Sequence, residues 1–191
     1  MILTRWVFIT LALYIQQSPP LAFARTAHPG HAAHVHGEAR INIVVEGTRA
    51  TVEFIAPGAS LYGFEHAART DAEKKAQAVA FSQIEQQIGS MVAFPADRLC
   101  QFIKQKIGLV ADDKRAHTQQ PAGHKEHHDP RSHTEVQADF TVACQKPLAG
   151  SQVRFHVTKV FPELRELTIQ VLTETKQLGA TITNDNGSVE L

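Results

Sequence analysis

Two stretches with strict alternation of apolar and polar residues constrain the fold of this chain most strongly. From Glu38 to Glu46 alanine, isoleucine and valine alternate with charged and amide side chains, and the same pattern returns from Glu135 to Cys144. Successive side chains of a β-strand point to opposite faces, so a period of two predicts half-buried strands. The chain is therefore expected to build a sheet with one covered face.

Further strands are predicted on either side of these two stretches. Glu46-Gly47-Thr48 forms a turn, from which Arg49 to Ala56 returns as the second strand of a hairpin. The pattern also favours three more strands, over residues 99–110, 152–159 and 166–173. A hairpin-like end over residues 176–191 is expected to turn at Asn186-Gly187.

A single long helix is predicted between the strands. Thr70-Asp71-Ala72-Glu73 has the pattern of a capping box, and the helix that it opens runs to about Gly89. One apolar stripe of this helix is expected to lie across the sheet, and it comprises Ala72, Ala76, Val79, Ala80, Ile84 and Ile88. The predicted fold class is α+β: an antiparallel sheet of six to eight strands, one capped helix packed on it, and a mobile His-rich loop insertion.

The amino-terminal segment has the organisation of an export signal. Arg5 precedes an apolar run from Trp6 to Ile15, and Ala22-Phe23-Ala24 has the form of a cleavage site. An uncleaved anchor is the alternative, but about ten apolar residues are too few for a bilayer, which needs roughly 20. We predict a signal peptide over residues 1–24 and one domain over residues 25–191, exported to the periplasm and without a membrane segment after cleavage.

Two cysteines, Cys100 and Cys144, occur in this exported chain, and a disulfide between them is the default pairing. The bridge would close a loop of about 45 residues and stabilise the fold by about 4 kcal/mol. The alternative is that either cysteine binds a metal. Neither belongs to a C-x-x-C pair, which disfavours that alternative.

Nine of the eleven histidines lie in two short segments. The first segment contains His28, His31, His34 and His36. The last two are separated by one residue, so in an extended strand they share a face and can share one ion. Imidazole nitrogen is a common ligand of zinc, and four of them satisfy its tetrahedral preference. A solvated tail is the alternative interpretation.

The second segment, Ala111–His133, contains no apolar residue larger than alanine. Such a composition buries too little apolar surface to offset the entropy of ordering, so we predict a disordered insertion in a hairpin. Its histidines are expected to bind metal weakly and exchange it quickly; they are His117, His124, His127, His128 and His133. A polar linker without metal is the alternative.

The remaining candidates are isolated. Glu65 and His66 have ligand chemistry, or they make hydrogen bonds at the entry of the helix. His156 lies between Phe155 and Val157 on a predicted strand and is expected to be exposed and uninvolved. No H-E-x-x-H or G-x-S-x-G motif is present, and the formal net charge is zero. Neither an enzyme nor a nucleic-acid partner is therefore expected.

Taken together, the motifs resemble those of the ZrgA-like zinc-regulated periplasmic proteins. The resemblance is carried by His31-Ala-Ala-His34-Val-His36-Gly37, Gly63-Phe64-Glu65-His66, the Thr70 helix start, Phe140-x-x-x-Cys144 and Phe161-Pro162-x-Leu164. It implies a zinc-binding accessory protein that captures or buffers more than one Zn²⁺ and works with the substrate-binding protein or permease of an ABC-type importer. It also implies metal ligands in the central histidine-rich stretch, in His34-x-His36 and in Glu65-His66.

Three other functions are compatible with the residues. Imidazole binds Cu²⁺ more tightly than Zn²⁺, so copper or nickel handling is one alternative. Cleavage after Arg25 would place His28 third in the mature chain, as in a square-planar copper or nickel chelate. A zinc hydrolase of unfamiliar layout with Glu38 or Glu65 as base is another, and a purely structural exported domain is the last.

Overall fold

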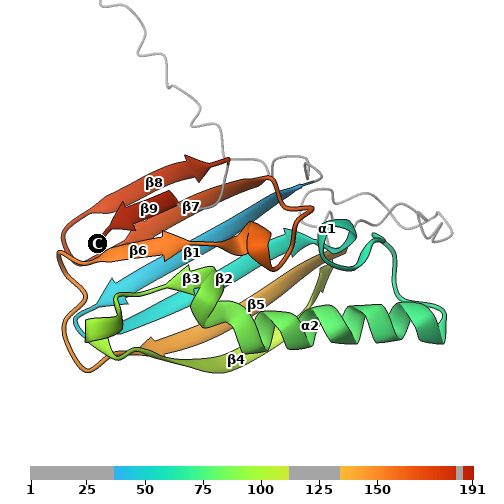
Figure 1. Ribbon diagram of the computed structural model, residues 1–191, viewed down its shortest axis with the longest axis horizontal. Helices are drawn as coiled ribbons and strands as arrows, with labels where there is room; N and C mark the ends of the chain where they lie inside the picture. The colour runs from blue at the N-terminus through green and yellow to red at the C-terminus, as the bar shows by residue number, and fades with distance from the viewer. Residues whose placement is uncertain (1–36, 112–133, 184–186) are drawn as a thin grey trace, which may run out of the picture. The chain divides into compact units, whose positions relative to one another are not determined.

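In the part of the chain that the structure describes, six strands form the larger of two sheets, in the order β4-β5-β2-β1-β7-β8 (Figure 1). The computed structural model describes residues 37–111, 134–183 and 187–191, which belong to one compact unit. The predicted signal peptide and the nine clustered histidines lie outside these residues. The strands are β1 (Glu38–Glu46), β2 (Arg49–Pro57), β4 (Gln101–Ala111), β5 (Thr134–Ala143), β7 (Glu166–Leu172) and β8 (Gln177–Ile182).

The alternation of residue types becomes an alternation of burial. On β1, Ala39, Ile41 and Ile43 are at most 1 % exposed, whereas Glu46 at the end of the strand is exposed. Strand β5 buries its apolar residues in the same way. The β1–β2 hairpin is confirmed, and Gly47 takes a φ of 57° in its turn, a conformation that favours glycine. One face of the sheet is therefore the core face, and the other faces solvent; the solvent face is mostly polar, although Val44 and Leu172 are exposed on it.

The sheet is mixed rather than purely antiparallel. Its pairs are antiparallel except for β1 and β7, which run parallel from Glu38↔Glu166 to Val44↔Leu172. The prediction of an antiparallel sheet was wrong at this pair. After β5 the chain makes its return pass as β6 in the second sheet, so β7 enters the large sheet in the direction of β1.

A second, three-stranded sheet has the order β3-β6-β9. Its strands are β3 (Val92–Ala93), β6 (Gln152–Phe155) and β9 (Gly187–Glu190). The predicted terminal hairpin over 176–191 is wrong, because β8 pairs with β7 whereas β9 pairs with β6. The strand predicted over 152–159 ends at Phe155, and the 3₁₀ helix η2 (Val157–Lys159) follows it.

Helix α2 (Asp71–Met91) begins with the predicted capping box. The Glu73 amide donates to Thr70 Oγ1 over 3.2 Å, and the Glu73 carboxylate accepts from the Thr70 amide over 2.9 Å. The helix buries Ala80, Ile84, Ile88 and Met91. Val79 of the predicted stripe is 50 % exposed, so the buried face begins later and extends to Met91 rather than stopping at Gly89. No helix among residues 37–111, 134–183 and 187–191 is long and apolar enough to span a membrane.

The Cys100–Cys144 disulfide is confirmed, with a sequence separation of 44. It joins the residue before β4 to the residue after β5, next to the Gln101↔Ala143 pair. The other end of this hairpin is the Ala111↔Thr134 pair, where residues 112–133 connect the two strands. A disulfide sulfur has no thiolate to bind metal, so the alternative of a cysteine ligand is excluded.

Candidate functional site

One end of the large sheet holds the residues through which both histidine-rich segments join the fold. Glu38 at the start of β1 pairs with Glu166, and Ala111 at the end of β4 pairs with Thr134. Pro57 of the strand between them pairs with Glu135. These pairs lie at the same end of the sheet, which we call the anchoring end (Figure 1). In the sequence, residues 28–36 directly precede Gly37 and β1, and residues 112–133 lie between Ala111 and Thr134.

A single short segment, residues 58–66, is hydrogen-bonded to both of these joining points. The Gly37 amide donates to Ser60 Oγ over 3.1 Å, and the Ser60 side chain is buried. The Thr134 amide donates to the carbonyl of Glu65 over 3.1 Å, and Thr134 Oγ1 lies 3.4 Å from the Tyr62 hydroxyl. Both points of entry are therefore tied to the segment that contains the candidate ligands Glu65 and His66.

The local sequence explains why this segment turns back on itself. Pro57 ends β2, helix α1 spans Gly58–Tyr62, and Gly63 ends the helix with a φ of 94°. Gly58 lies so close to the Tyr62 ring that a Cβ would clash with it. Tyr62 packs on Phe64 with ring centroids 4.5 Å apart, and Phe64 stacks on His66 at 5.0 Å. This row of rings places the imidazole in front of the amino terminus of α2.

The His66 imidazole is held between a carbonyl and a carboxylate. Nδ1 lies 3.0 Å from the Ala67 carbonyl, and Nε2 lies 3.8 Å from Glu73 Oε1. When Nδ1 carries the proton and donates it to that carbonyl, Nε2 presents its lone pair on the Glu73 side. A carbonyl-oriented imidazole beside a carboxylate is a ligand arrangement typical of divalent metals. The His66 side chain is 39 % exposed, so an ion can reach it.

Glu73 both caps helix α2 and faces His66, and the sequence predicted only the capping role. Its Oε2 accepts from the amides of Thr70 and Arg69, at 2.9 and 2.7 Å, whereas Oε1 faces His66. The hydrogen bonds from Thr70 and then Arg69 hold the pKa of Glu73 below its ordinary value, and His66 acts in the same direction. The capping pattern explained Glu73 completely, so the sequence contained no sign that it also faces an imidazole.

Across the described part of the chain, no group of three or more histidine, cysteine, aspartate or glutamate side chains is arranged to hold a metal. His66 and Glu73 form a pair, and a tetrahedral zinc site needs four ligands. The predicted ligands His28, His31, His34, His36, His117, His124, His127, His128 and His133 lie outside the described residues.

The structure also describes His156 and Glu38, and His156 departs from the expectation of an exposed residue. His156 is half-buried after β6 rather than exposed, because its amide donates to the Met91 carbonyl and holds the residue against the end of α2. Its Nδ1 is buried and has no hydrogen-bond partner among the described residues. Glu38, considered as a hydrolytic base, accepts a hydrogen bond from Thr168 over 3.1 Å.

The carboxylates of the polar face are also engaged. Glu53 and Asp139 are directly opposite in the sheet, and the Gln137 amide donates to both, at 2.7 and 3.0 Å. Asn42 donates to the second oxygen of Glu53 over 2.6 Å. This network offsets the repulsion between two adjacent carboxylates.

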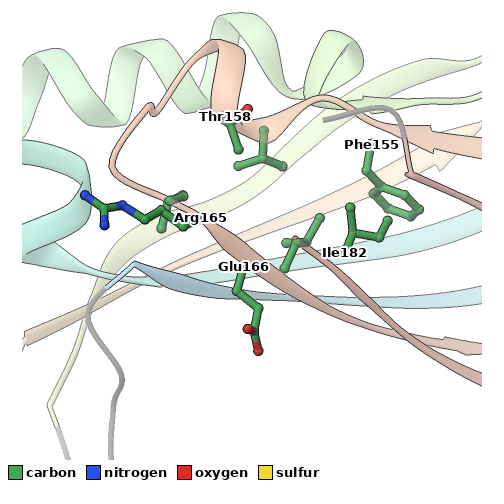
Figure 2. A pocket seen from close by; sticks show the side chains of 8 residues that line it. Phe155, Thr158, Arg165, Glu166 and Ile182 are labelled. Atoms are coloured by element: carbon green, nitrogen blue, oxygen red, sulfur yellow. The ribbon is translucent and has the colours of Figure 1, made fainter. Parts of the chain in front are cut away.

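An apolar pocket lies between the two sheets and offers no room for a ligand. Phe155 and Ile182 line it together with Leu164 and Leu167, and Figure 2 shows the first two side chains pointing toward each other. Its free volume is about 10 Å³, roughly that of one water molecule. It is a packing gap between core side chains and not a ligand site.

The family model described as ZrgA family zinc uptake protein matches residues 33–191, and the chain belongs to this family. A search of curated proteins found no match. Family membership indicates a protein related to zinc uptake, with Zn²⁺ as the ion bound.

Proposed function

We propose that this ZrgA family member is a periplasmic accessory protein that captures or buffers Zn²⁺ and assists its uptake by an ABC-type importer. The observation that carries the proposal is the anchoring end. There one short segment bonds both to Gly37, which follows the first histidine-rich segment, and to Thr134, which follows the second. The same segment presents His66 beside Glu73.

The proposed ligands belong to two kinds of chain segment. His66, its neighbour Glu65 and the carboxylate of Glu73 belong to the fold and are positioned before an ion arrives. The two histidine-rich segments supply the other imidazoles, and the composition of residues 111–133 predicts that binding must also order that segment. Such ligands bind each ion more weakly and release it faster, which suits capture and transfer. The proposed set is His28, His31, His34, His36, His117, His124, His127, His128 and His133.

One sequence prediction and one structural observation support an exported location. The predicted signal peptide over residues 1–24 precedes the domain. The Cys100–Cys144 disulfide requires an oxidising compartment to form and persist, and the periplasm is one.

Native mass spectrometry of the mature chain with zinc competition tests the proposal. We would compare the wild type with a deletion of residues 112–133, with His34→Ala/His36→Ala, and with His66→Ala. His156→Ala is the matched control. It also removes one imidazole, but from a residue whose amide is bonded to the Met91 carbonyl and which is not among the proposed ligands.

We expect the deletion to lose several ions and the His34/His36 variant to lose a further one. His66→Ala should weaken the most tightly held ion, while His156→Ala should bind like the wild type. A wild type that binds no zinc at micromolar free metal would overturn the proposal. Retention of Cu²⁺ under those conditions would assign the protein to copper handling instead.

A further inference from the structure

The two edges of the large sheet are built differently. Strand β4, at one edge, carries Lys104 and Lys106, and its register with β5 shifts between them. Charged side chains and a bulge are the usual means of preventing an edge strand from pairing with another chain. Lys104 is also held by an ion pair with Glu85 of α2, at 2.6 Å. The β4 edge is therefore protected.

Strand β8, at the other edge, has none of these protections. Its sequence is Gln-Leu-Gly-Ala-Thr-Ile, with no charge and no proline. It pairs with β7 without a shift from Gln177↔Leu172 to Ile182↔Leu167. Within the part of the chain that the structure describes, no strand pairs with its outer side. The outward amide and carbonyl groups of β8 thus form a template for one more strand.

We propose that β8 pairs with β8 of a second copy of this chain, antiparallel about a two-fold axis through Ala180. This register places Leu178 of one copy opposite Ile182 of the other on the core face of both sheets. It places Gly179 opposite Thr181 on the polar face. A two-fold axis perpendicular to the sheet keeps each copy's core face on the same side, so two sheets of six strands become one continuous sheet.

Charge makes a second copy the favoured occupant. A strand without charge meets an identical strand without like-charge repulsion, whereas it offers a partner carrying charged side chains no complementary group. The apolar members of β8 are half-buried already and their exposed parts would be covered by the same residues of the partner. The exchange is symmetric, as an isologous interface requires.

The pairing leaves the anchoring ends apart. Ile182 pairs with Leu167, next to the anchoring end, and Gln177 lies at the other end of the strand. Antiparallel pairing therefore places the two anchoring ends at opposite ends of the joint sheet. Zinc binding per chain is expected to be independent of dimer formation, so this inference and the proposed function can fail separately.

Sedimentation equilibrium of the metal-free mature chain tests the inference. The wild type should dimerise, and Gly179→Lys/Thr181→Lys should raise the dissociation constant at least roughly tenfold, because each paired position then sets two ammonium groups opposite each other. A Cβ at Gly179 meets only the Ile169 carbonyl oxygen, at 3.9 Å, so the fold accommodates the change. Thr51→Lys/Gln170→Lys is the matched control, since it adds the same charge to the polar face away from the edge.

A charge-swap experiment separates edge pairing from loss of folding. Gly179→Glu/Thr181→Glu should also be monomeric alone, and an equimolar mixture with the lysine variant should form a heterodimer. Circular dichroism checks that each variant retains its strands. A wild type that remains monomeric at every protein concentration up to roughly millimolar overturns the inference. A wild-type dimer whose dissociation constant neither edge variant changes overturns it as well.

Discussion

Removal of the Cys100–Cys144 disulfide should lower the free energy of unfolding by about 4 kcal/mol. The bridge closes a loop with a sequence separation of 44. In the chain-entropy model a loop of about 45 residues removes about 13 cal/mol/K from the unfolded chain, which is about 4 kcal/mol at 298 K. The double variant Cys100→Ser/Cys144→Ser is the perturbation, because it removes the bond and keeps the size of both side chains.

Shortening the insertion provides a second, independent test of the disulfide's contribution to the free energy of unfolding. Replacing residues 112–133 by a two-residue turn roughly halves the loop that the disulfide closes. The entropic cost of closure grows with the logarithm of length, so the disulfide's contribution should fall by about 0.6 kcal/mol. The turn can be that short because Ala111 and Thr134 are directly paired.

Urea unfolding, monitored by circular dichroism with zinc chelated, measures all four proteins: wild type and double variant, each with and without the insertion. A loss below about 1 kcal/mol in the double variant would refute the entropic reasoning for this hairpin. A disulfide contribution that rises when the insertion is removed would refute it as well.

Three further changes test other parts of the fold. Phe54→Ala should cost about 3 to 5 kcal/mol in urea unfolding, because the Phe54 side chain is 0 % exposed in the core. Gln137→Glu should destabilise the fold near neutral pH and much less in acid, because it replaces the amide that donates to Glu53 with another carboxylate; a pH series of melting temperatures would show this. Glu73 has a pKa below its ordinary value of 4.5, so its stabilisation is present above that pH and is lost as the pH falls through the folded-state pKa. The stability gap between wild type and Glu73→Gln, measured in chelator, should therefore be largest above pH 4.5 and close in acid, and a gap that is constant with pH would contradict the assigned cause.

Local sequence patterns predicted those parts of the fold that depend on neighbouring residues or on a few recognisable residue types. The burial of β1 and β5 follows from a period of two, and the start of α2 follows from the reciprocal bonds of Thr70 and Glu73. The Cys100–Cys144 pairing needed only two cysteines and an oxidising compartment. In each case the residues that decide the outcome are few and are recognisable by type.

The second sheet could not be predicted from such local patterns. Strand β3 has two residues and β9 has four, and neither is long enough to display a period. Whether β8 pairs with β9 or with β7 depends on contacts across the core. Leu178, Ala180 and Ile182 match the buried face of β7, and Val189 is paired with Val153 of β6. The parallel β1–β7 pair has the same origin, since it depends on the path of the chain through β6.

The sequence predicted which residue types belong to the candidate site, but not how they are arranged in space. His66 was recognisable as an imidazole near a helix start, but its partner Glu73 is brought near by the path of residues 67–70 and by the stacking of Phe64 on His66. The bonds from Gly37 to Ser60 and from Thr134 to Glu65 connect residues far apart in the sequence. No spacing rule links those pairs, so only the fold reveals that the two histidine-rich segments enter at one end.

The core explains why zinc can be cargo for this protein rather than a structural metal. A structural zinc domain folds only when the ion supplies the missing stability. Here both sheets and α2 bury a core that includes Phe54, Ile84 and Phe155, and the Cys100–Cys144 bridge adds to it. The described domain therefore has its own sources of stability, and its proposed ligands do not have to hold it together. Ligands that do not have to stabilise the fold can bind zinc at an affinity that permits exchange, and the proposed transfer of zinc to an importer requires such an affinity.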